Sequence, residues 1–179
     1  MLMRLSEPAT VPWFLPGFAI SVAVGLAASG RVGRALGSRR AVAVALISSL
    51  GIIVSATLSP LHWAFQFGTV GTGSCDFSRV GLAPMRELFA FNDTSLNVLL
   101  FLPLGASIAF IPRSRHKVVV IVAAIALPFA IETTQMLVPW LDRACESADV
   151  VDNLTGLVLG LAGGSVAGWV AGAVYRRPR

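Results

Sequence analysis

Polar side chains of types that bind ligands or transfer protons sit inside, or directly beside, long apolar stretches of this chain, where such groups are costly to bury. They are Asn97, Glu132, Gln135, Arg143, Asp149, Asp152 and Asn153. Glu132 and Gln135 are three residues apart, so a helix places both on one face. A carboxylate in apolar surroundings can act as a general acid or base, and a guanidinium can bind phosphate. We therefore take these residues as candidate ligand-binding groups, with Glu132 as the candidate catalytic residue.

Structural roles compete with this interpretation. Asp93 and Asp152 are expected to cap helices and to interact with their N-terminal dipoles, with Asn92 as the alternative cap beside Asp93. Glu132 could equally be protonated, or be paired with Arg143 across the bundle. For Glu132 we favour a functional role, because an ionisable side chain inside a membrane span rarely has a purely structural role.

Other kinds of site find no support in the sequence. His62 and His116 are isolated, so no zinc pattern is present. The chain contains no P-loop, no Gly-x-Ser-x-Gly and no nucleotide-binding motif. We therefore expect neither a metal nor a cofactor.

The elements that position these residues follow from composition. Hydrophobic residues make up 55% of the 179 residues and charged residues only 13%, which excludes both a soluble domain and a disordered chain. Five apolar runs are each long enough to cross a bilayer as a helix: Val11–Ser29, Ala41–Leu58, Asn92–Ile111, Val118–Val138 and Leu154–Tyr175. The predicted fold class is an all-α, polytopic transmembrane helix bundle. Residues 27–29 resemble a signal-peptidase site, but we favour an uncleaved first helix.

The charges predict an orientation. Taking alternate loops as inside collects ten of the fourteen bases on one side: Arg31, Arg34, Arg39, Arg40, Arg113, Arg115, Lys117, Arg176, Arg177 and Arg179. The positive-inside rule then puts the N-terminus outside and the C-terminus inside. Every acid falls on the outer side or inside a span, so the net charge of +5 reports orientation and not nucleic-acid binding. The partner expected first is the lipid bilayer.

Small residues predict close helix contacts. Five glycines spaced by four form a groove along the last helix: Gly156, Gly160, Gly164, Gly168 and Gly172. We expect this face to pack within the bundle, with homodimerisation through the same face as the alternative.

The two cysteines, Cys75 and Cys145, both fall in outer segments. An oxidising outer side permits a disulfide between them, and two free thiols remain the alternative.

Three ordered motifs resemble the VanZ-like membrane protein family. They are the run Asn97-Val98-Leu99-Leu100-Phe101-Leu102-Pro103-Leu104-Gly105, the run Ile131-Glu132-Thr133-Thr134-Gln135, and a block formed by Arg143, Asp149, Asp152, Asn153, Gly156 and Gly160. In this chain the asparagine of the block directly follows its second aspartate, whereas the family often has further residues between them. The resemblance covers about residues 59–161. It suggests dividing the chain into residues 1–58, two helices with a basic cytoplasmic loop, and residues 59–179, a VanZ-like three-helix core.

The resemblance implies a multi-pass protein of the bacterial cytoplasmic membrane, in a family whose founding member is associated with resistance to the glycopeptide teicoplanin. Two functions stay open. In the first, an outer-leaflet polar pocket engages an envelope ligand, such as a lipid-linked precursor. In the second, the protein is an intramembrane enzyme on a lipid-linked substrate, with Glu132 as acid or base and Arg143 binding a phosphate.

Overall fold

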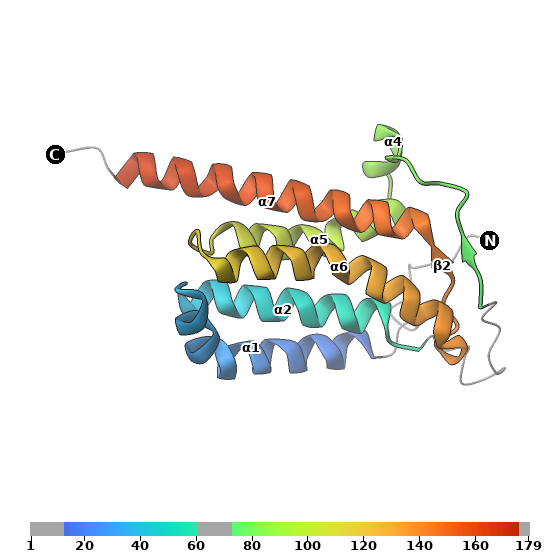
Figure 1. Cartoon of the computed structure of the whole chain (residues 1–179), viewed down its shortest axis with the longest axis horizontal. Coiled ribbons are helices and arrows are strands. Elements are labelled where there is room, and N and C mark those ends of the chain that lie inside the picture. The colour runs from blue at the N-terminus through green and yellow to red at the C-terminus, as the bar shows by residue number, and fades with distance from the viewer. Residues whose placement is uncertain (1–12, 61–72, 176–179) are drawn as a thin grey trace.

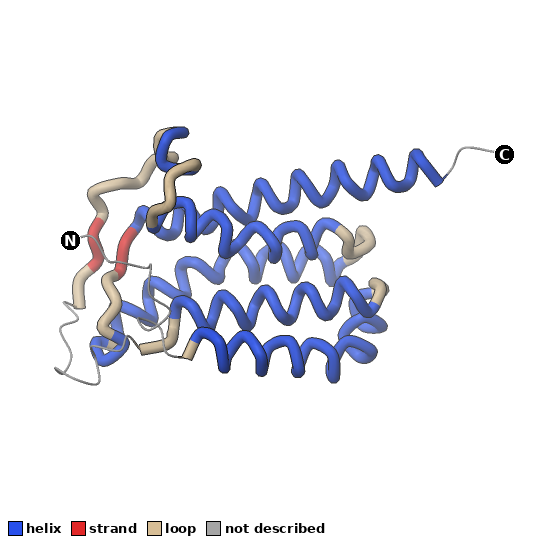
Figure 2. Tube along the Cα trace, turned by 180° about the vertical axis from the view of Figure 1, so that it is seen from behind, coloured by secondary structure: helices blue, strands red, loops and turns tan. Residues whose placement is uncertain are grey.

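The computed structural model describes residues 13–60 and 73–175 of the chain. Five long helices run side by side (Figure 1): α1 (Phe14–Leu36), α2 (Arg40–Thr57), α5 (Asp93–Ala109), α6 (Arg115–Leu137) and α7 (Ser147–Tyr175). Shorter elements complete the order along the chain: β1 (Cys75–Asp76), α4 (Met85–Leu88), η1 (Pro139–Leu141) and β2 (Cys145–Glu146). The two short strands pair in parallel at one end of the bundle (Figure 2). The predicted all-α bundle is therefore confirmed.

The sides of the bundle are apolar. Large hydrophobic side chains are exposed along the lengths of α1, α6 and α7: Leu15, Ile20, Val24, Leu26, Val118, Val119, Val122, Ile125, Phe129, Val158, Leu159, Val166 and Trp169. Among the described residues, α1, α2, α6 and α7 are each long and apolar enough to cross a membrane, and α5 is an apolar helix of 17 residues. An apolar surface of this extent is stable in lipid and not in water. The molecule is an all-α membrane helix bundle.

Local chemistry sets where the helices begin and end. Asn92 caps α5 by accepting a hydrogen bond from the Ser95 backbone N–H at 3.0 Å, and the Ser95 side chain completes the capping box. The expectation that Asp152 caps the last helix is wrong. That helix begins at Ser147, seven residues before the predicted Leu154, so Asp152 lies inside it. The early start places Asp149 and Asn153 on the same helix, as their spacing allows.

The tightest contact in the bundle joins α5 to α7 and depends on glycine. A Cβ at Gly156, Gly160 or Gly164 would collide with the backbone of α5, and a Cβ at Gly105 would collide with that of α7. Only residues without a side chain allow two helix backbones to approach this closely. An ideal Cβ at Gly168 would lie 3.7 Å from the Phe110 ring at the end of α5. The groove is therefore covered from its start to this point.

Gly172 has nothing within 4 Å of an ideal Cβ among the described residues. In Figure 1 the C-terminal part of α7 extends beyond the other helices. A homodimer through the covered part of the groove would have to displace α5.

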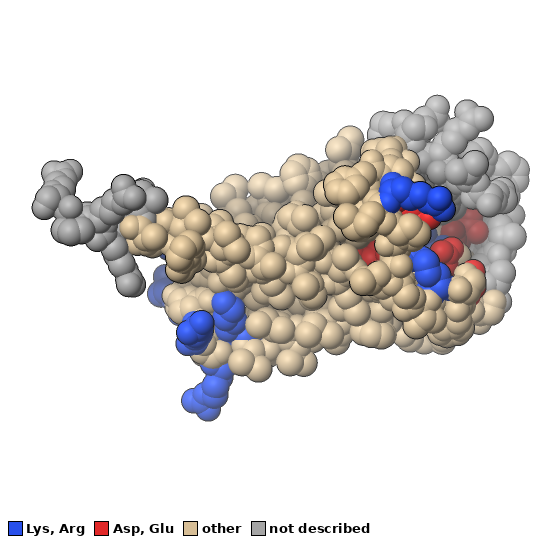
Figure 3. Space-filling model, turned by 90° about the horizontal axis from the view of Figure 1, so that it is seen from above, with Lys and Arg blue, Asp and Glu red and all other residues tan. Residues whose placement is uncertain are grey.

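In Figure 3 the acidic residues gather at one end of the bundle, whereas basic residues lie at both ends. Arg39 and Arg113 belong to the end where α1 meets α2 and α5 meets α6, and the acidic residues gather at the opposite end. Arg176, Arg177 and Arg179 lie outside the described residues. The end that carries the acids also carries the candidate site.

Candidate functional site

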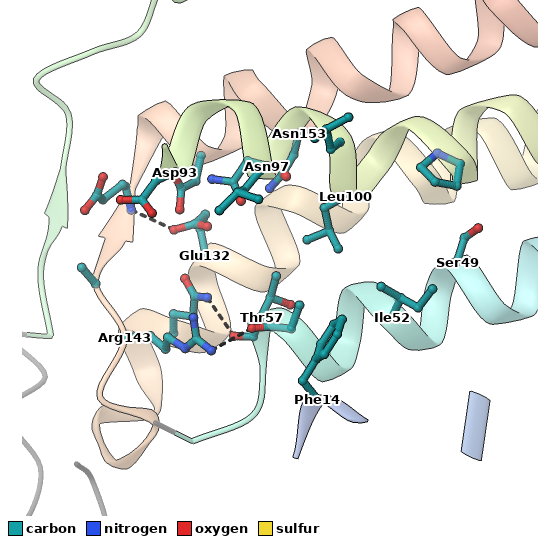
Figure 4. A pocket seen from close by; sticks show the side chains of 18 of the residues that line it. Phe14, Ser49, Ile52, Thr57, Asp93, Asn97, Leu100, Glu132, Arg143 and Asn153 are labelled. Carbon is teal, nitrogen blue, oxygen red and sulfur yellow. Dashed lines mark hydrogen bonds between the residues drawn. The ribbon is translucent and has the colours of Figure 1, made fainter. Parts of the chain in front are cut away.

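A cavity of about 690 Å³ opens at the acidic end of the bundle (Figure 4). It is enclosed by the starts of α1, α5 and α7, the C-terminal half of α2, and the last turns of α6. Its polar lining consists of the hydroxyl residues Ser49 and Thr57 and of Asp93, Asn97, Glu132, Gln135, Arg143, Glu146, Asp149 and Asn153. Six of the seven residues that the sequence singled out therefore meet in one cavity.

The rest of the cavity wall is apolar. Its main hydrophobic side chains are Phe14, Leu15, Ile52, Leu96, Leu99, Leu100 and Pro103. Leu15 of α1 and Leu99 of α5 are well exposed, whereas Glu132 at the inner end is buried. Leu15 and Leu99 mark an apolar mouth at the side, between α1 and α5, and the lining residues Phe91 and Asp93 are also exposed, at the acidic end. A polar inner end and an apolar mouth give it an amphipathic lining.

Glu132 is held at the polar end by the backbone of the chain segment before α7. One carboxylate oxygen, Oε2, accepts a hydrogen bond of 2.8 Å from the Glu146 backbone N–H. The expected pairing of Glu132 with Arg143 does not occur, because that guanidinium lies elsewhere. Among the described residues, Oε1 of Glu132 has no hydrogen-bond partner, so half of the carboxylate stays available to a ligand.

Arg143 and Gln135 close the lower side of the cavity against the end of α2. The Arg143 Nη2 donates to the carbonyl of Ala56 at 2.7 Å and to that of Ser59 at 3.4 Å. Gln135 Nε2 donates to the carbonyl of Thr57 at 2.9 Å. Both side chains satisfy carbonyls that the end of a helix leaves free. Burial lowers the pKa of Arg143, whereas the nearby Asp149 carboxylate raises it.

Several buried polar atoms of the cavity lack a partner among the described residues. They are Gln135 Oε1, Arg143 Nε and Asn153 Oδ1. Gln135 is only 6% exposed and Asn153 only 1%, and no described residue donates a hydrogen bond to either acceptor. A buried polar group without a hydrogen bond costs roughly 1–3 kcal/mol. A molecule in the cavity that forms hydrogen bonds with these atoms would remove this cost.

Asp152 lies outside the cavity. Its carboxylate accepts hydrogen bonds from Arg79 at 3.0 Å and 2.5 Å, and Arg79 also donates to the Ala148 carbonyl at 3.5 Å. This contact is the one ion pair within residues 13–60 and 73–175. The hydrogen bond to Asp152 raises the pKa of Arg79 above its ordinary value, against the opposing effect of burial. Sequence reasoning did not find this pair, since Arg79 lies in a loop with no spacing relation to Asp152.

The ion pair belongs to a larger connection that we call the clasp. The structure joins Cys75 and Cys145 in a disulfide, with their Cα atoms 4.5 Å apart, and pairs β1 with β2 in parallel at the same residues. The Ser147 hydroxyl donates to the Arg79 carbonyl at 2.8 Å. The clasp, defined as β1, β2, the disulfide, Arg79, Ser147 and Asp152, ties the loop before α5 to the start of α7.

Sequence reasoning missed several residues of the cavity. It treated Asp93 only as a cap and Glu146 only as an outer acid, and both line the cavity. It gave no function to the apolar wall, because a leucine that lines a cavity looks like any other leucine of a span. Among the described residues, no three His, Cys, Asp or Glu side chains are grouped as metal ligands.

The fold and the site together define the class of the protein: a membrane helix bundle with an amphipathic cavity at its acidic end. The sequence model of the VanZ/LLP1 family matches residues 46–167, and the chain belongs to this family. No curated protein and no solved structure matches the chain.

The matched region contains every polar residue of the cavity, whereas Phe14 and Leu15 of the mouth lie outside it. The match begins inside α2, so the division of the chain at residues 58 and 59 stays a prediction.

Proposed function

We propose that this VanZ-like protein is a multi-pass protein of the bacterial cytoplasmic membrane whose cavity binds an amphiphilic envelope molecule from the outer leaflet. The ligand class is a lipid-linked precursor, or the lipid tail of a glycopeptide. The second case would connect this chain to the family's association with teicoplanin resistance. The observation that carries the proposal is the lining itself. Buried amide and carboxylate groups form one end, and leucine side chains form a mouth toward the lipid.

The position of the mouth supports a lipid route of entry. Leu99 lies six residues after the first residue of α5, which is about 9 Å along the helix. A ligand entering between α1 and α5 would keep its acyl chain at the depth of the lipid tails. Its polar head would reach Asn97, Glu132 and Asn153, which Figure 4 shows gathered at the top of the cavity. An amphiphile therefore fits the lining better than a wholly polar solute.

Photo-cross-linking tests this proposal. The probe is a single-chain C12 alcohol with a diazirine in its tail, added to protein in phosphatidylcholine nanodiscs. We expect labelling of the peptides that contain residues 14–15 and 96–103. Leu100→Trp fills the cavity and should reduce this labelling several-fold, with Leu96→Phe as a milder second variant. Val119→Trp, on the lipid-facing side of α6, is the matched control and should leave it unchanged. Equal labelling in all four proteins would refute the proposal.

The proposed orientation places the acidic end and the cavity outside, with the N-terminus out and the C-terminus in. The arginines and lysine at the opposite end support it through the positive-inside rule. Gly81→Cys and His116→Cys lie at the two ends on exposed positions. We expect a membrane-impermeant maleimide to label intact cells only at residue 81. Labelling only at residue 116 would invert the topology and contradict an outer-leaflet ligand.

An enzyme acting on a lipid-linked substrate is the second candidate, and the free Oε1 of Glu132 favours it. Glu132→Gln keeps the hydrogen-bond acceptor for Glu146 but cannot exchange a proton, so it separates catalysis from binding. If probe labelling persists in this variant while a cell-envelope phenotype is lost, Glu132 acts chemically. If both persist, the enzyme hypothesis fails. Arg143 is less suited to bind a phosphate than its sequence position indicated, because its Nη2 already donates to the carbonyls of Ala56 and Ser59.

A further inference from the structure

The geometry points to a cationic, hydrogen-bond-donating head group, of the primary ammonium type, on the amphiphile that occupies the cavity. This inference rests on the proposed function and narrows it, because it specifies the chemistry of the ligand's polar end and argues against a lipid-linked precursor whose head is a phosphate. Three independent features carry it: the balance of charge in the lining, the position of the single cation, and the kind of atom that is left unsatisfied.

The charge of the lining is one-sided. Four carboxyl groups line the cavity, those of Asp93, Glu132, Glu146 and Asp149, and Arg143 is the one cation among the described lining residues. No ion pair among the described residues neutralises any of the four. The Arg79 guanidinium, the nearest other base of the clasp, is already paired with Asp152. Carboxylates that face one cavity repel each other, and a bound cation removes that repulsion.

The one cation of the lining forms its hydrogen bonds with backbone carbonyls and makes no ion pair with an acid among the described residues. Figure 4 shows Arg143 beside Thr57 at the lower side of the cavity, while Asp93, Asn97, Glu132 and Asn153 lie at the upper side. Two carbonyls of the α2 end hold its Nη2 in place. A ligand head at the upper side would therefore meet carboxylate and amide groups first.

The unsatisfied atoms are mostly acceptors. Gln135 Nε2 donates to the Thr57 carbonyl, so its amide cannot be flipped without setting two oxygens against each other. Its Oε1 must then be the free end, and it is buried without a partner among the described residues. Asn153 Oδ1 is also buried and has no partner among the described residues, although no hydrogen bond of its Nδ2 fixes the orientation of that amide. Two buried acceptors with carboxylates around them require a donor, and an ammonium group supplies three.

A phosphate head has the opposite chemistry. It carries negative charge and oxygen acceptors, so it would add to the repulsion among the acids and leave Gln135 Oε1 and Asn153 Oδ1 without donors. Its one favourable contact would be the buried Nε of Arg143. A neutral sugar head has donors but no charge, so it should rank between the two.

Competition against the C12 diazirine alcohol tests the head group. The competitors are dodecylammonium, dodecyl maltoside and dodecyl phosphate, each titrated into phosphatidylcholine nanodiscs. Their concentrations are expressed as mole fractions in the bilayer, so that differences in membrane partitioning cancel. We expect dodecylammonium to displace the probe at about one tenth of the mole fraction that dodecyl phosphate needs, a preference of about 1.4 kcal/mol. In Asp149→Asn this preference should fall toward unity, whereas Asp76→Asn, an acid outside the cavity, should keep it.

The outcomes separate the two levels of the argument. Stronger displacement by dodecyl phosphate, or displacement by dodecyl maltoside equal to that by dodecylammonium, would overturn the cationic head while leaving an amphiphile in the cavity. A preference for dodecylammonium that persists unchanged in Asp149→Asn and in Glu132→Gln would also overturn it, since the preference would then come from the membrane surface. Probe labelling that is unchanged by Leu100→Trp would instead refute the proposed function itself.

Discussion

The clasp and the cavity both include residues from the first turns of α7, and they use the same types of residue in opposite ways. Asp152 and Asp149 are three residues apart on that helix. In the clasp, Asp152 is bonded twice by Arg79. In the cavity, no described residue bonds the carboxyl of Asp149. A polar group whose bonding is complete stabilises the fold, and one whose bonding is incomplete is available to a ligand.

This difference assigns separate roles to the two regions. Changes to the Cys75–Cys145 disulfide or to the Arg79–Asp152 ion pair should lower stability and leave ligand selectivity alone, because none of these four residues lines the cavity. Changes in the cavity should do the reverse. A variant that changed both the free energy of unfolding and the ligand selectivity would contradict this separation of roles.

The largest loss of stability should follow from opening the disulfide. The bridge joins residues 70 apart in sequence, and closing a loop of this length is worth up to about 4 kcal/mol in the chain-entropy account. We expect Cys75→Ser to lower the free energy of unfolding in SDS titrations by about 2–4 kcal/mol. Reductant should destabilise the wild type by a similar amount and leave Cys75→Ser unaffected. An unfolding curve of the wild type that does not respond to reductant would exclude a structural role for the bridge.

The second-largest loss of stability should come from breaking the ion pair of the clasp, and the loss should depend on which partner is removed. The side chain of Asp152 is 2% exposed and that of Arg79 is 26% exposed. Arg79→Ala leaves a buried carboxylate without its cation, and we expect a loss of about 2–3 kcal/mol in the free energy of unfolding. Asp152→Ala leaves an arginine that can turn to water, so about half that loss is expected. Equal losses, or a larger loss for Asp152→Ala, would contradict the burial argument.

The smallest effect on stability should come from the cavity. Asp149→Asn keeps the shape of the side chain and removes one of four mutually repelling carboxylates. We expect the free energy of unfolding to change by less than about 1 kcal/mol, and not to fall. The same variant should lose the preference for dodecylammonium. A loss of stability comparable to that of Arg79→Ala would mean that Asp149 is part of the scaffold.

The contrast between clasp and cavity also explains what the sequence could predict. The glycine spacing on α7 and the apolar runs gave the bundle, because helical periodicity and span length are local properties. The spacing of Glu132 with Gln135 and the early polar residues of α7 gave most of the polar lining. Local spacing could not place Arg79 against Asp152, since a loop residue meets its partner only after folding. It also could not separate Asp149 from Asp152, because three residues on a helix leave both on one face and only tertiary contacts distinguish them.

The apolar wall was unpredictable for a related reason. Phe14 and Leu99 come from helices that are distant in sequence, and each reads as an ordinary residue of a span. Only the packing of α1 on α2 brings them to one mouth. The Ser21 and Ser55 hydroxyls, bonded to the Gly17 and Gly51 carbonyls of their own helices, lie in that tight α1–α2 contact.

Intermolecular NOEs test the central claim most directly. The protein would carry methyl labels on Leu, Ile and Val and amide labels on Asn and Gln, with dodecylammonium present in deuterated nanodiscs. We predict contacts from the terminal methyl of the probe to Leu99, Leu100 and Ile52, and from its head methylene to the side-chain amides of Gln135 and Asn153. Contacts confined to outward-facing methyls such as those of Val119 and Val122 would show that the cavity does not bind the amphiphile.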